Sequence, residues 1–235
     1  MRKLALTVLS FILIFTLSAQ TKTTPSTAKP KTATTITGRL VEIKTDSGTM
    51  IVKLYDSTPL HRDNFIKLVK EKFYDSLLFH RVIQNFMIQG GDPQSKDADS
   101  TAMLGSGETP GDMIPAEFRP DLYHKKGALA MARTENPEKA SSNCQFYIVQ
   151  GQPYTNAQLN DMECKLRQSN PEFYFTEAER KAYNTIGGTP FLDQNYTVFG
   201  EVIKGLDVID TIAAMQTDQN DRPVNNVRMK MRMLN

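Results

Sequence analysis

The chain has 235 residues, with 28 basic and 26 acidic side chains, and this length allows one large domain or two small ones. Five of the basic side chains and none of the acidic ones lie in residues 1–36, so the rest of the chain holds 23 basic and 26 acidic residues, a net charge of −3. Because a nucleic-acid-binding domain needs a basic surface, we expect no nucleic acid as a partner.

The N-terminus has the pattern of an export signal. Arg2 and Lys3 precede an apolar run over residues 4–17, and small residues follow up to Ala19. The run is shorter than the roughly 20 residues of a membrane-spanning helix. We therefore expect a signal peptide over residues 1–19, no membrane span after its cleavage, and a protein in the periplasm or secreted. Leu17 is an unusual residue near a cleavage point, so an uncleaved segment that retains the protein at the membrane stays an alternative.

Residues 20–36 are rich in Thr, Lys and Pro and poor in apolar side chains. Such a segment cannot bury enough apolar surface to offset the entropy lost on ordering, so a disordered linker is predicted. One folded domain is then expected over residues 37–235. Whether Cys144 and Cys164 pair stays open, because two cysteines do not define a disulfide framework. Three scattered histidines without metal-ligand spacing indicate neither a metal nor another cofactor.

Most of the domain shows the alternation of apolar and polar residues that is typical of strands. A hairpin is predicted from two strands joined by a turn at 46–48. The predicted strands are 40–45, 50–54, 78–83, 86–89, 127–132, 145–150, 196–203 and 227–233. Helices are predicted at 59–72, with Thr58 as the N-cap, and at 205–214. The expected fold is mainly β: a closed antiparallel β-barrel of about eight strands, capped by two helices.

Residues 153–190 differ from the strands around them and are predicted to be a helical insertion. Asn156 can cap a first helix, and residues 176–179 form a capping-box pattern for a second, which Gly187 and Gly188 would end. Two interpretations stay open. The insertion either decorates the scaffold or borders a binding pocket as a substrate-selecting lid.

The stretch FHRVIQNFMIQGGD, residues 79–92, matches the signature F-H-R-x-x-x-x-F-M-x-Q-G-G-D of cyclophilin-type peptidyl-prolyl isomerases at every fixed position. Further stretches similar to that family follow in the family's order. They lie at 58–65, 114–118, 128–133, 145–148, 191–193 and 198–200. The chain from about residue 38 to 215 thus resembles the family, apart from the insertion. The resemblance implies isomerase activity without a cofactor and a monomer that binds proline-containing, unfolded or partly folded polypeptides.

Carried over position by position, the resemblance makes Arg81 the catalytic arginine and Gln89 the residue that orients it. The substrate-binding residues that it implies are Phe86, Met87, Ala132, Arg133, Gln145, Tyr147, Phe191, Leu192 and Tyr196. The absence of an acid–base pair near Arg81 fits this reaction, because rotation about a C–N bond moves no proton. A permanently charged guanidinium can instead stabilise the twisted amide.

Three positions differ from the common family pattern. Tyr147 stands where Phe is usual, while Phe191 and Tyr196 replace the Trp and His of eukaryotic members, so we expect altered ligand preference and weak cyclosporin binding. Strand parity points His80 away from Arg81, which predicts a hydrogen-bonded structural histidine. The alternative function is a non-catalytic proline-peptide binding module or chaperone. Arg81 and Gln89 favour the enzyme, because a binder needs no cation at the amide nitrogen.

Overall fold

The computed structural model describes residues 38–109 and 111–234, so the expected signal peptide and linker lie outside the described residues. Eight strands form one antiparallel sheet in the order β3-β4-β6-β5-β7-β2-β1-β8. The strands are β1 (Arg39–Thr45), β2 (Gly48–Leu54), β3 (Phe79–Ile83), β4 (Met87–Gly90), β5 (Ala128–Met131), β6 (Phe146–Val149), β7 (Val198–Lys204) and β8 (Met229–Leu234). All eight predicted strands are present, with boundaries that differ by one or two residues.

The two edge strands of this sheet, β3 and β8, meet only around their first residues. Backbone N–H groups of Ser76 and Phe79 donate to the carbonyl oxygens of Met229 and Val227, each over 2.9 Å. One isolated β-bridge, between Leu78 and Arg228, adds to these bonds. Within the described residues, no continuous ladder of backbone hydrogen bonds joins the two strands. The sheet is therefore curled into a half-barrel, and the predicted closed barrel is not confirmed.

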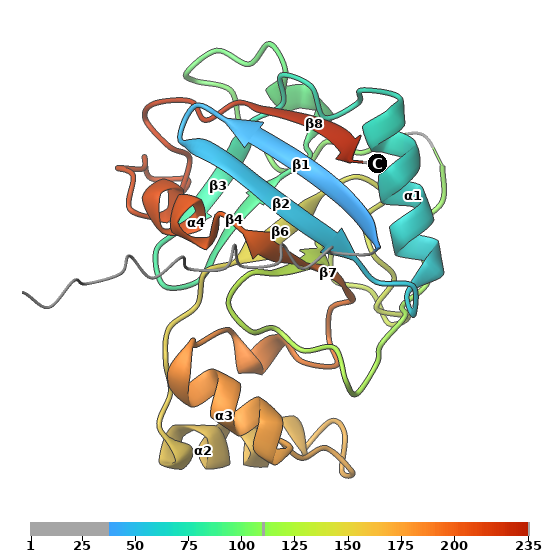
Figure 1. Ribbon diagram of the computed structural model, residues 1–235, viewed down its shortest axis with the longest axis vertical. Coiled ribbons are helices and arrows are strands. Elements are labelled where there is room, and N and C mark those ends of the chain that lie inside the picture. Colours follow the sequence, from blue (N-terminus) through green and yellow to red (C-terminus); the bar gives the residue numbers. More distant parts are fainter. Residues whose placement is uncertain (1–37, 110, 235) are drawn as a thin grey trace, which may run out of the picture. The chain divides into compact units, whose positions relative to one another are not determined.

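The helices are α1 (Pro59–Lys70), α2 (Asn156–Leu166), α3 (Glu177–Thr185) and α4 (Leu206–Ala213), with two short 3₁₀ helices, η1 (Pro93–Ser95) and η2 (Pro190–Leu192). As predicted, α1 and α4 pack against the sheet. Figure 1 shows α2 and α3 next to each other, below the sheet and away from α1 and α4. Among the described residues, no helix has the length and apolar character required to cross a membrane.

The β1–β2 hairpin shows how the sequence alternation builds the core. Val41 and Ile43 on β1 lie opposite Val52 and Met50 on β2, and all four side chains are fully buried. Burial of a side chain of this size contributes about 1.5–3 kcal/mol. The same cluster contains apolar residues of α1 and α4, so both helices are held to the sheet by one core.

The insertion has a small apolar core of its own, formed by Tyr154, Leu159, Phe173, Phe175 and Tyr183. Its second helix begins with the predicted capping box at residues 176–179 and ends just before Gly187, whose φ is +80°. The first helix is capped differently from the prediction.

Thr155, rather than the predicted Asn156, is the N-cap of α2. Its hydroxyl accepts a hydrogen bond from the backbone N–H of Gln158, at 3.3 Å. The Gln158 side chain in turn accepts from the backbone N–H of Thr155, at 2.8 Å. A Gln three residues after Thr155 therefore completes a reciprocal capping box.

A remote carboxylate caps α1. Thr58 occupies the N-cap position, but its side chain makes no capping hydrogen bond. Glu117 accepts the backbone N–H groups of Leu60, at 3.1 Å, and His61, at 3.0 Å. The same carboxylate lies 2.7 Å from Nδ1 of the buried His61 ring. The start of α1 thus depends on the loop that carries Glu117.

Replacing Glu117 with Ala removes this acceptor from two backbone N–H groups and from the His61 ring. We expect E117A to lower the free energy of unfolding by about 1–3 kcal/mol, as measured by urea denaturation. The exposed Glu138 offers a control, and E138A should change the value by less than about 0.5 kcal/mol. Equal losses in the two variants would show that Glu117 does not stabilise α1.

Candidate active site

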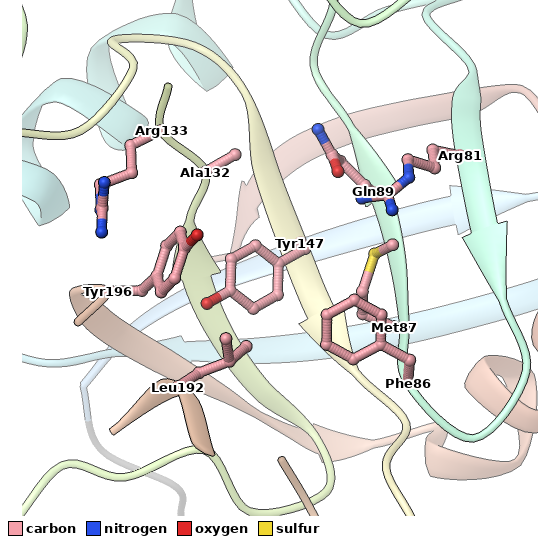
Figure 2. A pocket seen from close by; sticks show the side chains of 9 residues that line it. All are labelled: Arg81, Phe86, Met87, Gln89, Ala132, Arg133, Tyr147, Leu192 and Tyr196. Atoms are coloured by element: carbon pink, nitrogen blue, oxygen red, sulfur yellow. The ribbon is translucent and has the colours of Figure 1, made fainter. Parts of the chain in front are cut away.

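An open pocket of about 180 Å³ collects most of the side chains that the sequence singled out. Its lining consists of Arg81, Phe86, Met87, Gln89, Ala132, Arg133, Tyr147, Leu192 and Tyr196. Figure 2 shows Arg81 and Gln89 at one end and Arg133 and Tyr196 at the other. Phe86 and Met87 lie below Arg81 and Gln89 in this view, Tyr147 lies near the middle, and Leu192 lies below Tyr147. Two predicted binding residues, Gln145 and Phe191, are not part of the lining.

Strand register brings the central residues together. On β3 and β4, Arg81 lies opposite Gln89, and β4 places Gln89 opposite Tyr147 of β6. Residues directly opposite one another in antiparallel strands project to the same face of a sheet. One face of three neighbouring strands therefore carries the cation, the amide and the aromatic ring.

Arg81 is held by a residue that the sequence did not indicate. Its Nε lies 3.4 Å from Oδ2 of Asp221, and both side chains are nearly half exposed. Asp221 is fixed in turn, because its carbonyl oxygen accepts the backbone N–H of Val82 over 2.7 Å. The contact engages Nε, so the two terminal nitrogens of Arg81 can donate to a ligand.

Gln89 was expected to orient Arg81, but its side chain is hydrogen-bonded to Gln145 instead. Its Nε2 donates to Oε1 of Gln145 over 3.1 Å. Gln145 is buried, and its own Nε2 donates to the carbonyl oxygens of Gly105, at 3.1 Å, and Gly107, at 2.7 Å. The structure thus places Gln145 behind Gln89, where it fixes the orientation of the Gln89 amide.

The end of the sequence motif, Gly90-Gly91-Asp92, supports this arrangement. Gly91 has a φ of +96°, and a Cβ there would lie 2.3 Å from the carbonyl oxygen of Cys144, so only glycine fits. The buried Asp92 carboxylate accepts the backbone N–H groups of Gly105 and Gly107. Asp92 therefore fixes the loop around Gly105 and Gly107, and the carbonyl oxygens of this loop fix the Gln145 side chain.

The hydroxyl of Tyr147 is bonded away from the pocket. It lies 2.9 Å from Nε2 of His124, whose Nδ1 lies 2.8 Å from Oδ1 of Asp193. Figure 2 shows the hydroxyl pointing away from Arg81. Burial raises the pKa of Tyr147 well above its ordinary value. Beside Arg81, Tyr147 therefore presents the face of its ring, much as a Phe would.

The far end of the pocket is built by Arg133 and Tyr196. The guanidinium carbon of Arg133 lies 4.7 Å from the centre of the Tyr196 ring, and its Nε donates to the carbonyl oxygen of Asn195 over 3.0 Å. The backbone N–H of Ala132 donates to the carbonyl oxygen of Gln145, and this bond holds Ala132 in the wall of the pocket. Phe191 is 43% exposed and packs against Phe86, with 5.7 Å between ring centres.

His80 is buried, but the prediction that it is hydrogen-bonded was wrong. Both ring nitrogens lack a hydrogen-bond partner within residues 38–109 and 111–234. Burial lowers the pKa of His80 to about 4, so the ring is neutral at physiological pH. The question of a disulfide is also answered, since Cys144 is buried, Cys164 is exposed and both are free.

Sequence reasoning missed Asp221, His124 and Asp193 as parts of the site. Asp221 lies 140 residues from Arg81. Its polar segment has no periodicity that could indicate a partner on β3. His124 was considered only as a metal ligand, although its position shortly before a predicted strand placed it near the other strands of the sheet. Asp193 lay within a family-like stretch, next to the predicted binding residue Leu192.

Comparison with known proteins identifies the family. Residues 40–232 match the family model of the cyclophilin-type peptidyl-prolyl cis-trans isomerases. The chain is similar to a protein of Staphylococcus haemolyticus that is provisionally named a peptidyl-prolyl cis-trans isomerase. The two are 34% identical over 188 residues, which cover 80% of this chain and 86% of that protein. The chain belongs to the cyclophilin-type peptidyl-prolyl cis-trans isomerase family.

Two further similarities extend this result. A protein of Streptococcus pyogenes, provisionally named a bifunctional phosphatase/peptidyl-prolyl cis-trans isomerase, is 37% identical over 81% of this chain, which spans only 37% of that protein's length. The crystal structure of a Cryptosporidium parvum cyclophilin-type isomerase in the presence of the dipeptide Ala-Pro shares the fold. Its TM-score is 0.60 at 23% identity, and the match covers 83% of this chain and 99% of that one.

The buried His80 predicts a dependence of stability on pH. In the unfolded chain a histidine takes up its proton near pH 6.5, whereas folded His80 does so only near pH 4. The unfolded state therefore binds more protons between these values. The titration of His80 alone should lower the free energy of unfolding by about 3 kcal/mol as the pH decreases from about 6.5 to 4.

Urea unfolding at a series of pH values measures this loss. The variant H80Q lacks the titrating ring and should show a flatter profile in the same range, whatever its stability at neutral pH. Parallel profiles for H80Q and the unmodified protein would contradict the assignment.

Proposed function

We propose that this chain catalyses cis–trans isomerisation of X–Pro bonds in proline-containing, unfolded or partly folded polypeptides outside the cytoplasm. The observation that carries the proposal is the position of Arg81 at one end of a pocket, next to the apolar side chains of Phe86 and Met87 and the amide of Gln89. The N-terminal sequence pattern, with basic residues before a short apolar run, supports an exported location.

The chemistry follows from the nature of the peptide bond. Rotation about it has a barrier of about 18–20 kcal/mol, because the C–N bond has partial double-bond character. In the twisted amide this resonance is lost, and the prolyl nitrogen gains a lone pair that can accept a hydrogen bond. A guanidinium next to that nitrogen stabilises the twisted state more than either planar state, and this difference is what lowers the barrier.

The remaining residues of the pocket hold the substrate in place. The apolar side chains of Phe86, Met87 and Leu192 and the ring face of Tyr147 suit a proline ring, which they would remove from water. The Gln89 amide, fixed by Gln145, can bond to the substrate backbone. An acceleration of about 10⁵-fold requires only about 7 kcal/mol, a value that one charged hydrogen bond and a desolvated ring together can reach.

Replacing Arg81 tests the proposal directly. The unmodified protein should accelerate cis–trans exchange of an Ala-Pro peptide, measured by NMR exchange spectroscopy. In R81A, kcat/KM should fall by about 10²-fold or more, because the donor to the prolyl nitrogen is lost. R81K should recover only part of the activity, since an ammonium lacks the planar array of donors.

The exposed Arg119 supplies the control, because R119A removes a cation outside the pocket and should retain full activity. Binding of the peptide without acceleration by the unmodified protein would instead identify a proline-peptide binding module. Equal activity of R81A and the unmodified protein would exclude Arg81 as the catalytic residue.

Asp221 should affect catalysis through the orientation of Arg81. In D221N the Nε contact loses its charged acceptor, so we expect kcat/KM to fall by about threefold to tenfold with a smaller change in KM. The exposed Asp207 of α4 provides a matched control in D207N. If D221N and D207N have the same kcat/KM as the unmodified protein, Asp221 does not orient the guanidinium.

A further inference from the structure

Four buried side chains form a hydrogen-bonded chain from the insertion to the floor of the pocket. On α3, the hydroxyl of Tyr183 donates to Oδ2 of Asp193 over 2.6 Å. Oδ1 of Asp193 lies 2.8 Å from Nδ1 of His124, and Nε2 of His124 lies 2.9 Å from the hydroxyl of Tyr147. All four residues are at most 5% exposed.

The chemistry of the groups sets the direction of these bonds. The Asp193 carboxylate only accepts, and it already receives the backbone N–H of His124 over 2.9 Å. Nδ1 of His124 must therefore carry the proton that faces Asp193. When the ring carries this one proton alone, Nε2 is the acceptor and the Tyr147 hydroxyl donates to it. Every polar atom of the chain has a partner, and each bond fixes the rotation of the next side chain.

The backbone holds the insertion close to the same histidine. The N–H of Thr189 donates to the carbonyl oxygen of His124 over 2.8 Å. A Cβ at Gly188 would lie 2.2 Å from that oxygen and 2.6 Å from the Tyr183 ring. The segment that returns from α3 to the sheet therefore packs directly between Tyr183 and His124.

We propose that Tyr183 is a positioning residue for the isomerase reaction. Through Asp193 and His124 it fixes the orientation of the Tyr147 ring, on which the proline of the substrate would lie. The inserted helices then form part of the catalytic apparatus without contact to the substrate. This inference rests on the proposed function. It gives the insertion a role that differs from both earlier interpretations, scaffold decoration and a substrate-selecting lid.

The variant Y183F tests the inference, because it removes one hydroxyl and keeps the aromatic ring in the core of the insertion. It leaves Oδ2 of the buried Asp193 without its partner, which should loosen the chain as far as Tyr147. We expect kcat/KM for an Ala-Pro peptide to fall by about threefold or more. Tyr154 belongs to the same apolar cluster but lies outside the chain, so Y154F is the matched control and should stay within about 1.5-fold of the unmodified protein.

A double-mutant cycle distinguishes positioning from general destabilisation. The variant Y147F lacks the last hydroxyl of the chain and interrupts the route from Tyr183 to the pocket. In the Y147F background, adding Y183F should therefore change kcat/KM by less than about 1.5-fold. Equal effects of Y183F in both backgrounds, or equal effects of Y183F and Y154F, would overturn the proposal.

A second measurement does not depend on activity. The ¹⁵N chemical shifts of the His124 ring report which nitrogen carries the proton and how strongly each is bonded. Y183F should move both shifts, and Y154F should leave them unchanged. If the unmodified protein does not accelerate isomerisation, the proposed function fails, while these shifts still decide whether Tyr183 and His124 are coupled. Unchanged shifts in Y183F would overturn the coupling even in an active enzyme.

Discussion

The antiparallel register of β3, β4 and β6 is the constraint on which the rest of the site depends. It places Arg81, Gln89 and Tyr147 in one row, on a single face of the curled sheet. A shift of one residue in either pair would send these side chains to the opposite face. The close packing of Gly91 on the backbone of Cys144 opposes a shift that would bring Asp92 to this position, because a side chain there would collide with the carbonyl oxygen of Cys144.

Around this row, charge is used to orient groups more than to stabilise the fold. The ion pair of Arg81 and Asp221 is nearly half exposed, and pairs of that kind contribute at most about 1 kcal/mol to stability. The buried carboxylates orient groups behind the pocket. Asp92 fixes the loop behind Gln145, and Asp193 fixes the histidine behind Tyr147. The substrate would thus meet two arginine side chains, Arg81 and Arg133, among neutral surfaces, while the buried carboxylates of Asp92 and Asp193 lie behind them.

The sequence predicted what local patterns encode and missed what distant contacts decide. Alternation located the strands, and nine of the eleven side chains that the family resemblance predicted line one pocket, four of them from the motif at 79–92. Two missed residues are Glu117, which caps α1, and Asp221, which contacts Arg81. Each is a single residue in an irregular segment and belongs to no periodic pattern. Thr155 was missed because Asn156 is equally suited to a cap, and only the reciprocal bond with Gln158 decides between them. The extent of closure between β3 and β8 depends on the curvature of the whole sheet, which no local pattern records.

The bond between Tyr147 and His124 also has an evolutionary consequence. With Phe at position 147, a buried ring nitrogen of His124 would lose its partner, and with an apolar residue at 124, the Tyr147 hydroxyl would lose its own. Each single replacement leaves an unsatisfied polar atom, at a cost of about 1–3 kcal/mol, whereas a paired replacement does not. Among descendants of this chain, these two positions should therefore change together, and lineages that keep one residue should keep the other.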